Sequence, residues 1–295
     1  MSFSLTGENA REAERAIADR VAELETVFSP TREDSELFRV NAQSGSEVEI
    51  STDFLLVLGM SIVANEDTFG AFDATLGGAV ELWSQEKVPA SEELAAQVVG
   101  LDNLSLFRDK LQVTEGLKLN FGAVVKGYAS DCAKEILETY EIPRALLSLG
   151  GNIYAHGEKE DGTPWNIGVR DPLGEAQDWL GILQAENEFI IASGDYERVF
   201  EENGVRYHHI LDPKTKRPAE SDLHETVVVS QKGSCGDILS TALFVMGEEK
   251  AVEYWKNTRD FEMILVSSDG RVLITPNLKE RFTLTKDSYI LEVIE

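Results

Sequence analysis

Cysteine, histidine and basic side chains are all scarce in this sequence. Its 2 cysteines and 4 histidines imply no disulfide framework, and Cys132 and Cys235 belong to no cluster of the kind that binds zinc. Lysine and arginine together number 27 against 53 aspartates and glutamates, which leaves a formal net charge of −26. Because a surface this acidic repels nucleic acids and anionic lipids, we exclude both as partners.

Long apolar runs are missing as well. The longest, residues 54–64, contains Gly59 and Ser61 and is too short to span a bilayer, so we expect no transmembrane segment. Strand-like residues follow Met1 directly, so we also expect no signal peptide, and the compartment stays open. A hydrophobic content of 42%, with 27% charged residues over 295 positions, is typical of a globular protein with a substantial core.

Helical and strand patterns follow one another without strict alternation, which predicts an α+β fold rather than a doubly wound sheet. No repeat or long linker occurs, so we expect one domain over residues 1–295. Predicted helices cover residues 13–28, 52–63, 79–83, 91–99, 123–137 and 251–255, with another around Asp237. Predicted strands cover residues 2–5, 145–149, 153–156, 165–169, 180–183, 189–191, 207–211, 226–229, 263–266, 272–275 and 282–284, with a hairpin at 111–119.

Asp237 and Thr241 are the most informative pair of residues. Four positions apart in a helix, they lie on one face, and both are hard oxygen donors that suit Mg²⁺ or Ca²⁺ rather than zinc. A helix N-terminus here also offers backbone N–H groups to an anion. The motif alone favours a structural alternative, in which Asp237 is a helix cap and Thr241 bonds to its own backbone. The motifs around it reverse that preference.

Two glycine-rich segments accompany the pair. Residues 120–128 place two glycines and Lys126 at the start of a helix, where a ligand can approach the backbone beside a positive charge. The spacing is not that of a Walker loop. Gly150 and Gly151 follow a predicted strand and indicate either a plain turn or another close backbone approach. Arg170 ends a later strand and is equally often a solvated residue.

Two of the four histidines, His208 and His209, are adjacent in the predicted strand 207–211. Neighbouring strand residues point to opposite faces, so at most one of the two is expected to line a site. A histidine in a strand is usually structural, but the flanking Tyr, Asp-Pro and Thr favour a functional one. Imidazole is well suited to proton transfer near neutral pH.

Seven segments, taken in order, resemble the ApbE family, the FAD:protein FMN transferases. The resemblance covers nearly the whole chain. The matching segments are Asp34–Leu37 with Asn41, Gly70–Thr75 with Leu82 and Trp83, Gly122–Asp131, Ser148–Asn152, Ser193–Tyr196, His209–Pro213, and Asp237 with Ser240–Ala242.

This resemblance implies a single compact α+β domain of T-fold type that binds FAD in a cleft and Mg²⁺ at its diphosphate. FAD is cleaved between the phosphates, FMN passes through a phosphoester to a Thr or Ser motif of an acceptor protein, and AMP leaves. The implied metal ligands are Asp237, Thr241 and the carbonyl of Ala123. His209 is the implied proton acceptor, and Asp237 is the second catalytic residue. The implied FAD-binding residues are Glu36, Asp73, Lys126, Gly150, Gly151, Arg170, Ser193 and His209.

Four departures from the family pattern stand out. The Met-Gly-Thr of the first strand is absent, Thr31 replaces an aromatic residue near the flavin, Lys216 replaces a turn glycine and Asn120 replaces a common Asp. Two alternatives to the transferase therefore stay open: an Mg²⁺-dependent FAD diphosphatase with water as acceptor, and a flavin-binding protein without turnover. Relatives usually act outside the cytoplasm, so we expect an extracytoplasmic location, although this chain shows no signal peptide or lipidation cysteine.

Overall fold

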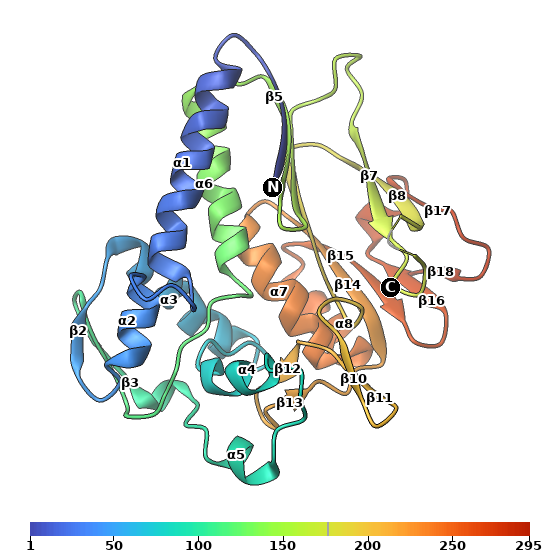
Figure 1. The fold of residues 1–295 in the computed structure, drawn as a ribbon. Helices are drawn as coiled ribbons and strands as arrows, with labels where there is room; N and C mark the ends of the chain where they lie inside the picture. The colour runs from blue at the N-terminus through green and yellow to red at the C-terminus, as the bar shows by residue number, and fades with distance from the viewer. Residues whose placement is uncertain (176) are drawn as a thin grey trace. The chain divides into compact units, whose positions relative to one another are not determined.

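An eight-stranded, largely antiparallel sheet is the main element of the fold (Figure 1). The computed structural model describes residues 1–175 and 177–295. The strand order is β1-β5-β6-β9-β14-β15-β16-β18, and the pairing of β16 with β18 is parallel. The strands are β1 (Ser2–Thr6), β5 (Arg144–Leu149), β6 (Asn152–His156), β9 (Glu188–Gly194), β14 (Leu223–Ser230), β15 (Glu262–Ser267), β16 (Arg271–Ile274) and β18 (Ile290–Val293).

Contacts between Cα atoms divide the chain into two compact units. The first unit comprises residues 1–20, 126–196 and 220–295, and it contains the whole eight-stranded sheet. The second unit comprises residues 21–125 and 197–219. The helix α1 (Ala10–Phe28) begins in the first unit and ends in the second.

In the first unit, the sheet lies between a helical layer and a second, smaller sheet. The helix α7 (Gly233–Met246) packs against β14, β9 and β6, with α6 (Val125–Thr139) beside it and α8 (Glu248–Thr258) following it (Figure 1). The other face packs its valines and isoleucines against the three-stranded sheet β17-β8-β7. Those strands are Phe282–Leu284, Trp179–Ala185 and Trp165–Arg170.

The second unit is built on short helices and hairpins. The side chain of Ser51 accepts a hydrogen bond from Phe54 N (3.3 Å) and so caps α3, and the ring of Phe54 packs on those of Phe28 and Phe121. The helices are α2 (Glu36–Ala42), α3 (Thr52–Asp67), α4 (Gly77–Trp83) and α5 (Ser91–Ala95). The strands are β2 (Glu47–Glu49), β3 (Leu104–Phe107), β4 (Lys110–Val113), β10 (Phe200–Glu202), β11 (Val205–Tyr207), β12 (Leu211–Asp212) and β13 (Arg217–Pro218).

The predicted fold class is confirmed, because helices and largely antiparallel sheets occur together in both units. The single domain over residues 1–295 stays a prediction. Among the described residues, no helix has both the length and the apolar character to cross a bilayer.

The predicted hairpin at 111–119 is wrong. The strand β4 pairs with β2 and β3 instead, and residues 117–119 form no strand. The alternation that suggested a strand arises because Leu117 and Leu119 are both buried. The side chain of Asn41 fixes this segment, since it accepts a hydrogen bond from Leu119 N (2.8 Å) and donates one to Leu119 O (3.0 Å).

The strand predicted at 207–211 is also wrong. The strand β11 ends at Tyr207 and β12 begins at Leu211, so His208 and His209 lie between them in irregular backbone. Strand geometry therefore does not set the directions of the two imidazole rings. Several helix boundaries shift as well: for example, α6 begins at Val125 rather than at residue 123, and α5 ends at Ala95 rather than at residue 99.

Candidate functional site

Two glycines let α6 meet the start of α7 at backbone distance. A Cβ atom on Gly127 would lie 2.2 Å from the carbonyl oxygen of Gly233, and a Cβ atom on Gly233 would lie 2.5 Å from the carbonyl oxygen of Gly127. Both separations are shorter than real Cβ contacts, so only glycine permits this packing. The contact brings the first turns of the two helices together.

Each of these helices supplies a carboxylate to the N-terminus of the other. Asp131 of α6 accepts hydrogen bonds from the backbone N–H groups of Gly233 (2.6 Å) and Ser234 (2.9 Å). Asp237 of α7 accepts one from Gly127 N (2.9 Å). First-turn N–H groups have no partner within their own helix, and the helix dipole favours an anion there. Asp237 therefore caps α6 and not its own helix, and the first-turn N–H groups of α7 bond to Asp131.

The carboxylate of Asp237 is buried and forms an ion pair with Lys126. Its side chain is 3% exposed, and Oδ1 lies 2.9 Å from Nζ of Lys126, whose side chain is 38% exposed. A buried carboxylate is costly unless charge and hydrogen bonds compensate it. Lys126 and Gly127, adjacent on α6, supply both.

The turn between β5 and β6 runs beside Lys126. A Cβ atom on Gly150 would lie 3.4 Å from Cδ of Lys126. Gly150 and Gly151 have φ angles of +62° and +96°, in the left-handed region that favours glycine. The structure thus brings the predicted residues Lys126, Gly150 and Asp237 together in the first unit.

A group of hydroxyls lies one helical turn beyond Asp237. Oγ of Ser193, on β9, lies 3.3 Å from Oγ1 of Thr241 and 2.9 Å from Oγ of Ser240. Thr241 and Asp237 share a helix face because they are four residues apart in α7. Ser193, Thr241 and Asp237 therefore belong to one polar face between α7 and the sheet.

The donor chemistry of this face fits a hard divalent cation. It offers a carboxylate already bonded to a cationic group, together with hydroxyl oxygens, which are the donor types that Mg²⁺ prefers. Over residues 1–175 and 177–295, no three His, Cys, Asp or Glu side chains gather as a metal cluster. A metal held here would complete its shell with carbonyl, substrate or water oxygens, as Mg²⁺ commonly does.

Two predicted acidic residues of the second unit serve local structure. Oε1 of Glu36 accepts a hydrogen bond from Ser51 N (2.6 Å) at the start of α3. Oδ1 of Asp73 accepts hydrogen bonds from the N–H (2.7 Å) and the hydroxyl (2.6 Å) of Thr75. Their roles towards FAD stay predictions.

Ala123 and His209 also belong to the second unit. Ala123 lies half-buried in the turn that leads into α6. His209 is exposed, and its Nδ1 lies 2.9 Å from the carbonyl oxygen of Glu197. The metal-ligand role of Ala123 and the proton-acceptor role of His209 stay predictions.

Arg170 contacts a different face of the sheet. Its guanidinium lies 4.4 Å from the ring centroid of Tyr196, whose hydroxyl donates to Glu225. Glu225 and Thr226 are neighbours in strand β14, so their side chains point to opposite faces of the sheet. The side chain of Thr226 points towards α7, because its Oγ1 donates a hydrogen bond to Ser240 O of that helix (2.5 Å). Arg170 is therefore tied to the sheet face that points away from α7.

One contact between a histidine and a carboxylate lies outside the residues predicted for the site. Nδ1 of His224 lies 2.7 Å from Oδ2 of Asp195. The two residues are adjacent because β9 pairs with β14, and Asp195 N donates to His224 O (3.1 Å). Asp195 stands in a family-like motif, but 29 residues separate it from His224. Strand pairing alone brings them together.

The model of the ApbE family matches residues 1–265 of this chain. The chain belongs to the ApbE family. An FAD:protein FMN transferase of Haemophilus influenzae is 33% identical over 303 residues, covering 97% of this chain and 87% of that protein. One of Treponema pallidum is 31% identical over 295 residues, covering 91% of this chain and 80% of that protein.

Solved ApbE structures have the same fold. The ApbE protein of Thermotoga maritima superimposes with a TM-score of 0.86 at 31% identity, over 95% of this chain and 94% of that chain. The flavin transferase ApbE of Vibrio cholerae gives 0.79 at 27% identity, over 97% and 91%. These ApbE relatives confirm the resemblance drawn from the seven segments, and with it the expected enzyme class, a transferase.

Proposed function

We propose that this chain is an Mg²⁺-dependent FAD:protein FMN transferase. It cleaves FAD between the phosphates, attaches FMN through a phosphoester to a Thr or Ser of an acceptor protein, and releases AMP. The observation that carries the proposal is the buried Asp237 of α7, bonded to Lys126 and followed one turn later by Thr241. The relatives of this chain that are named FAD:protein FMN transferase support the proposal.

Electrostatics explains why FAD needs such a site on this protein. The diphosphate carries roughly two negative charges, and the chain carries −26. Local positive charge must therefore offset the repulsion between protein and substrate. Lys126 and the cation held by Asp237 and Thr241 supply it, next to the glycines of the β5–β6 turn.

The residues have distinct tasks in the transfer. When bound, the metal polarises the attacked phosphorus and stabilises the charge on the departing AMP. Asp237 and Thr241 hold it, with the carbonyl of Ala123 as the third protein ligand. His209 accepts the proton of the incoming Thr or Ser hydroxyl. Positioning and charge stabilisation dominate phosphoryl transfer, so the protein needs no strong nucleophile of its own.

The experiment that tests this proposal incubates the purified chain with FAD and Mg²⁺, with and without a threonine-bearing acceptor peptide. We expect AMP in solution together with a peptide that is heavier by one FMN. AMP with an unmodified peptide would instead support the diphosphatase, since the same metal site serves water as acceptor. Bound FAD without AMP at any Mg²⁺ concentration would leave a flavin-binding protein.

The extracytoplasmic location is also part of the proposal. It is supported by the family resemblance alone. Fractionation of the source cells, with the chain detected by antibody in the envelope or the cytoplasm, tests it directly.

A further inference from the structure

We infer that the ammonium group of Lys126 neutralises Asp237 in the metal-free protein and leaves this carboxylate when a divalent cation binds. The inference rests on the proposed function, because it takes Asp237 as a metal ligand. It goes beyond that function by giving Lys126 two positions, one on Asp237 and one released. Lys126 is in this sense a positioning residue that keeps the site in order before the metal arrives.

The first support is how the two oxygens of Asp237 are used. Oδ2 accepts a hydrogen bond from the backbone N–H of Gly127, and Oδ1 accepts one from Nζ of Lys126, each at 2.9 Å. The backbone donor is fixed by helix α6, whereas the ammonium stands at the end of a flexible side chain. An exchange of cations at Oδ1 therefore leaves the carboxylate held in place through Oδ2.

The second support is charge. An ammonium group and a divalent cation on the same carboxylate oxygen repel each other strongly at contact distance, more so in a site that excludes water. The side chain of Asp237 is 3% exposed, so solvent screens that repulsion weakly. The carboxylate accordingly carries one of the two cations at a time.

The third support is the exit available to Lys126. Its side chain is 38% exposed and runs along the β5–β6 turn, where Gly150 presents no side chain to obstruct it. Because this side chain is partly exposed, the ammonium can turn towards solvent or towards a diphosphate. A bound diphosphate that attracts Lys126 therefore favours the metal, and the metal favours the diphosphate, by the same factor.

The test is calorimetric titration of the full chain with MgCl₂ in the absence of FAD. Lys126→Met removes the competing ammonium while keeping the apolar stem. The matched control is Lys232→Met, which removes an exposed lysine at the start of α7 that bonds to Asp237 nowhere in the described structure. We expect Lys126→Met to bind Mg²⁺ at least about fivefold more tightly than the wild type, which is the lower end of typical coupling between two ligands. Lys232→Met should stay within about twofold of the wild type, because that charge is screened by solvent.

A second variant distinguishes displacement of the side chain of residue 126 from Asp237 from the general effect of a positive charge near the metal. Lys126→Arg keeps the charge and can bond to the carboxylate through two N–H groups, so it should bind Mg²⁺ more weakly than the wild type. Thermal unfolding gives an independent signal. Metal-free Lys126→Met leaves a buried carboxylate without its counter-ion, so it should melt below the wild type and gain more in Tm on addition of Mg²⁺.

Two results would overturn the inference in distinguishable ways. If the wild type binds Mg²⁺ and Lys126→Met binds it no more tightly than Lys232→Met does, then Lys126 keeps its bond to Asp237 in the metal complex. If folded wild type and folded Lys126→Met both fail to bind Mg²⁺, then the metal site of the proposed function is itself wrong.

Discussion

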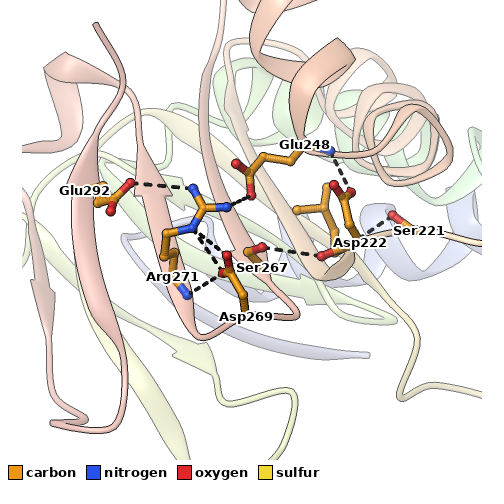
Figure 2. Close-up of polar contacts among 8 residues, drawn as sticks. Ser221, Asp222, Glu248, Ser267, Asp269, Arg271 and Glu292 are labelled. Carbon is orange, nitrogen blue, oxygen red and sulfur yellow. Dashed lines mark hydrogen bonds and ion pairs between the residues drawn. The ribbon is translucent and has the colours of Figure 1, made fainter.

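Two charged clusters in the first unit contrast in how their charges are solvated. The first is the Asp237 cluster, in which a carboxylate 3% exposed has one ionic partner among the described residues, Lys126. The second is the Arg271 cluster, in which one guanidinium 30% exposed faces three carboxylates (Figure 2). Its contacts are Asp269 (2.8 Å), Glu248 (2.8 Å) and Glu292 (3.6 Å).

The Arg271 cluster has more ion pairs than the Asp237 cluster, and it connects neighbouring elements of the fold. Arg271 joins β16 to the first turn of α8 and to β18. The hydrogen bonds that its guanidinium donates to Asp269 and Glu248 raise the pKa of this guanidinium. Figure 2 also shows Asp222, whose Oδ1 accepts a hydrogen bond from Glu248 N (2.9 Å) and caps α8. Water screens the partly exposed pairs, so each contributes little. Burial, and not the number of ion pairs, distinguishes the Asp237 cluster.

The largest effect is expected from Asp237→Asn. Loss of the charged ligand should lower the rate of AMP release from FAD by about 100- to 1,000-fold, the range for losing one electrostatic stabiliser of a transition state. The matched control, Asp269→Asn in the Arg271 cluster, should release AMP at the wild-type rate. A rate for Asp237→Asn within tenfold of the wild type would show that the Asp237 cluster is not the site of FAD cleavage.

The next effect is on stability. Gly127→Ala places a methyl group 2.2 Å from a backbone carbonyl oxygen, so α6 and α7 must separate. We expect the free energy of unfolding in urea to fall by about 1–3 kcal/mol. Gly59→Ala is the control, because a Cβ there meets nothing within 4 Å in helix α3. It should raise stability by about 0.5–1 kcal/mol, and an equal loss in both variants would contradict the role of close helix packing.

Stability at alkaline pH tests the effect of burial on a tyrosine hydroxyl. Burial raises the pKa of Tyr154, which is 1% exposed, and the nearby charges of Glu138 and Asp131 raise it further. A raised pKa contributes stability that is fully present below the ordinary tyrosine pKa of about 10 and is lost as pH rises above it. Urea unfolding from pH 8 to 11 should therefore show a loss of up to about 1.4 kcal/mol per pH unit above pH 10 from this group. Tyr154→Phe should show a shallower loss, and an unchanged slope would refute the assignment.

The smallest effect is expected from Arg271→Ala. Its partly exposed ion pairs should together contribute about 1 kcal/mol to the free energy of unfolding, measured in urea at low salt, and less at high salt. FMN transfer should be unaffected. A loss of transfer activity in a folded Arg271→Ala protein would break the distinction between the two clusters.

Local signals in the sequence predicted much of the fold. Helical spacing located α1, Ser51 marked the start of α3, and β-type patterns located the strands of the eight-stranded sheet up to β16. Periodicity failed at residues 111–119, where alternating burial occurs without strand pairing. It also failed at the adjacent histidines, whose conformation depends on side-chain bonds such as that of His208 to Ala219 O (3.1 Å).

The sequence pointed to the individual residues Lys126, Asp237 and Thr241, but not to the contacts between them. The spacing of Asp237 and Thr241 placed both on one helix face, and the glycines beside Lys126 indicated a close backbone approach. Pairing of Lys126 with Asp237 spans 111 positions, and only the packing of α6 on α7 reveals it. The same holds for Asp131, which caps α7 from across that contact. Such tertiary bonds leave no periodic signal in a single sequence.

The most direct measurement is the mass of a threonine-bearing acceptor peptide after incubation with FAD and Mg²⁺. Three proteins are compared: the wild type, Asp237→Asn and Asp269→Asn. The account predicts a gain of one FMN with the wild type and with Asp269→Asn, and an unmodified peptide with Asp237→Asn. A gain of one FMN with folded Asp237→Asn, at a rate equal to the wild type, would contradict the claim that the buried carboxylate is the centre of the reaction.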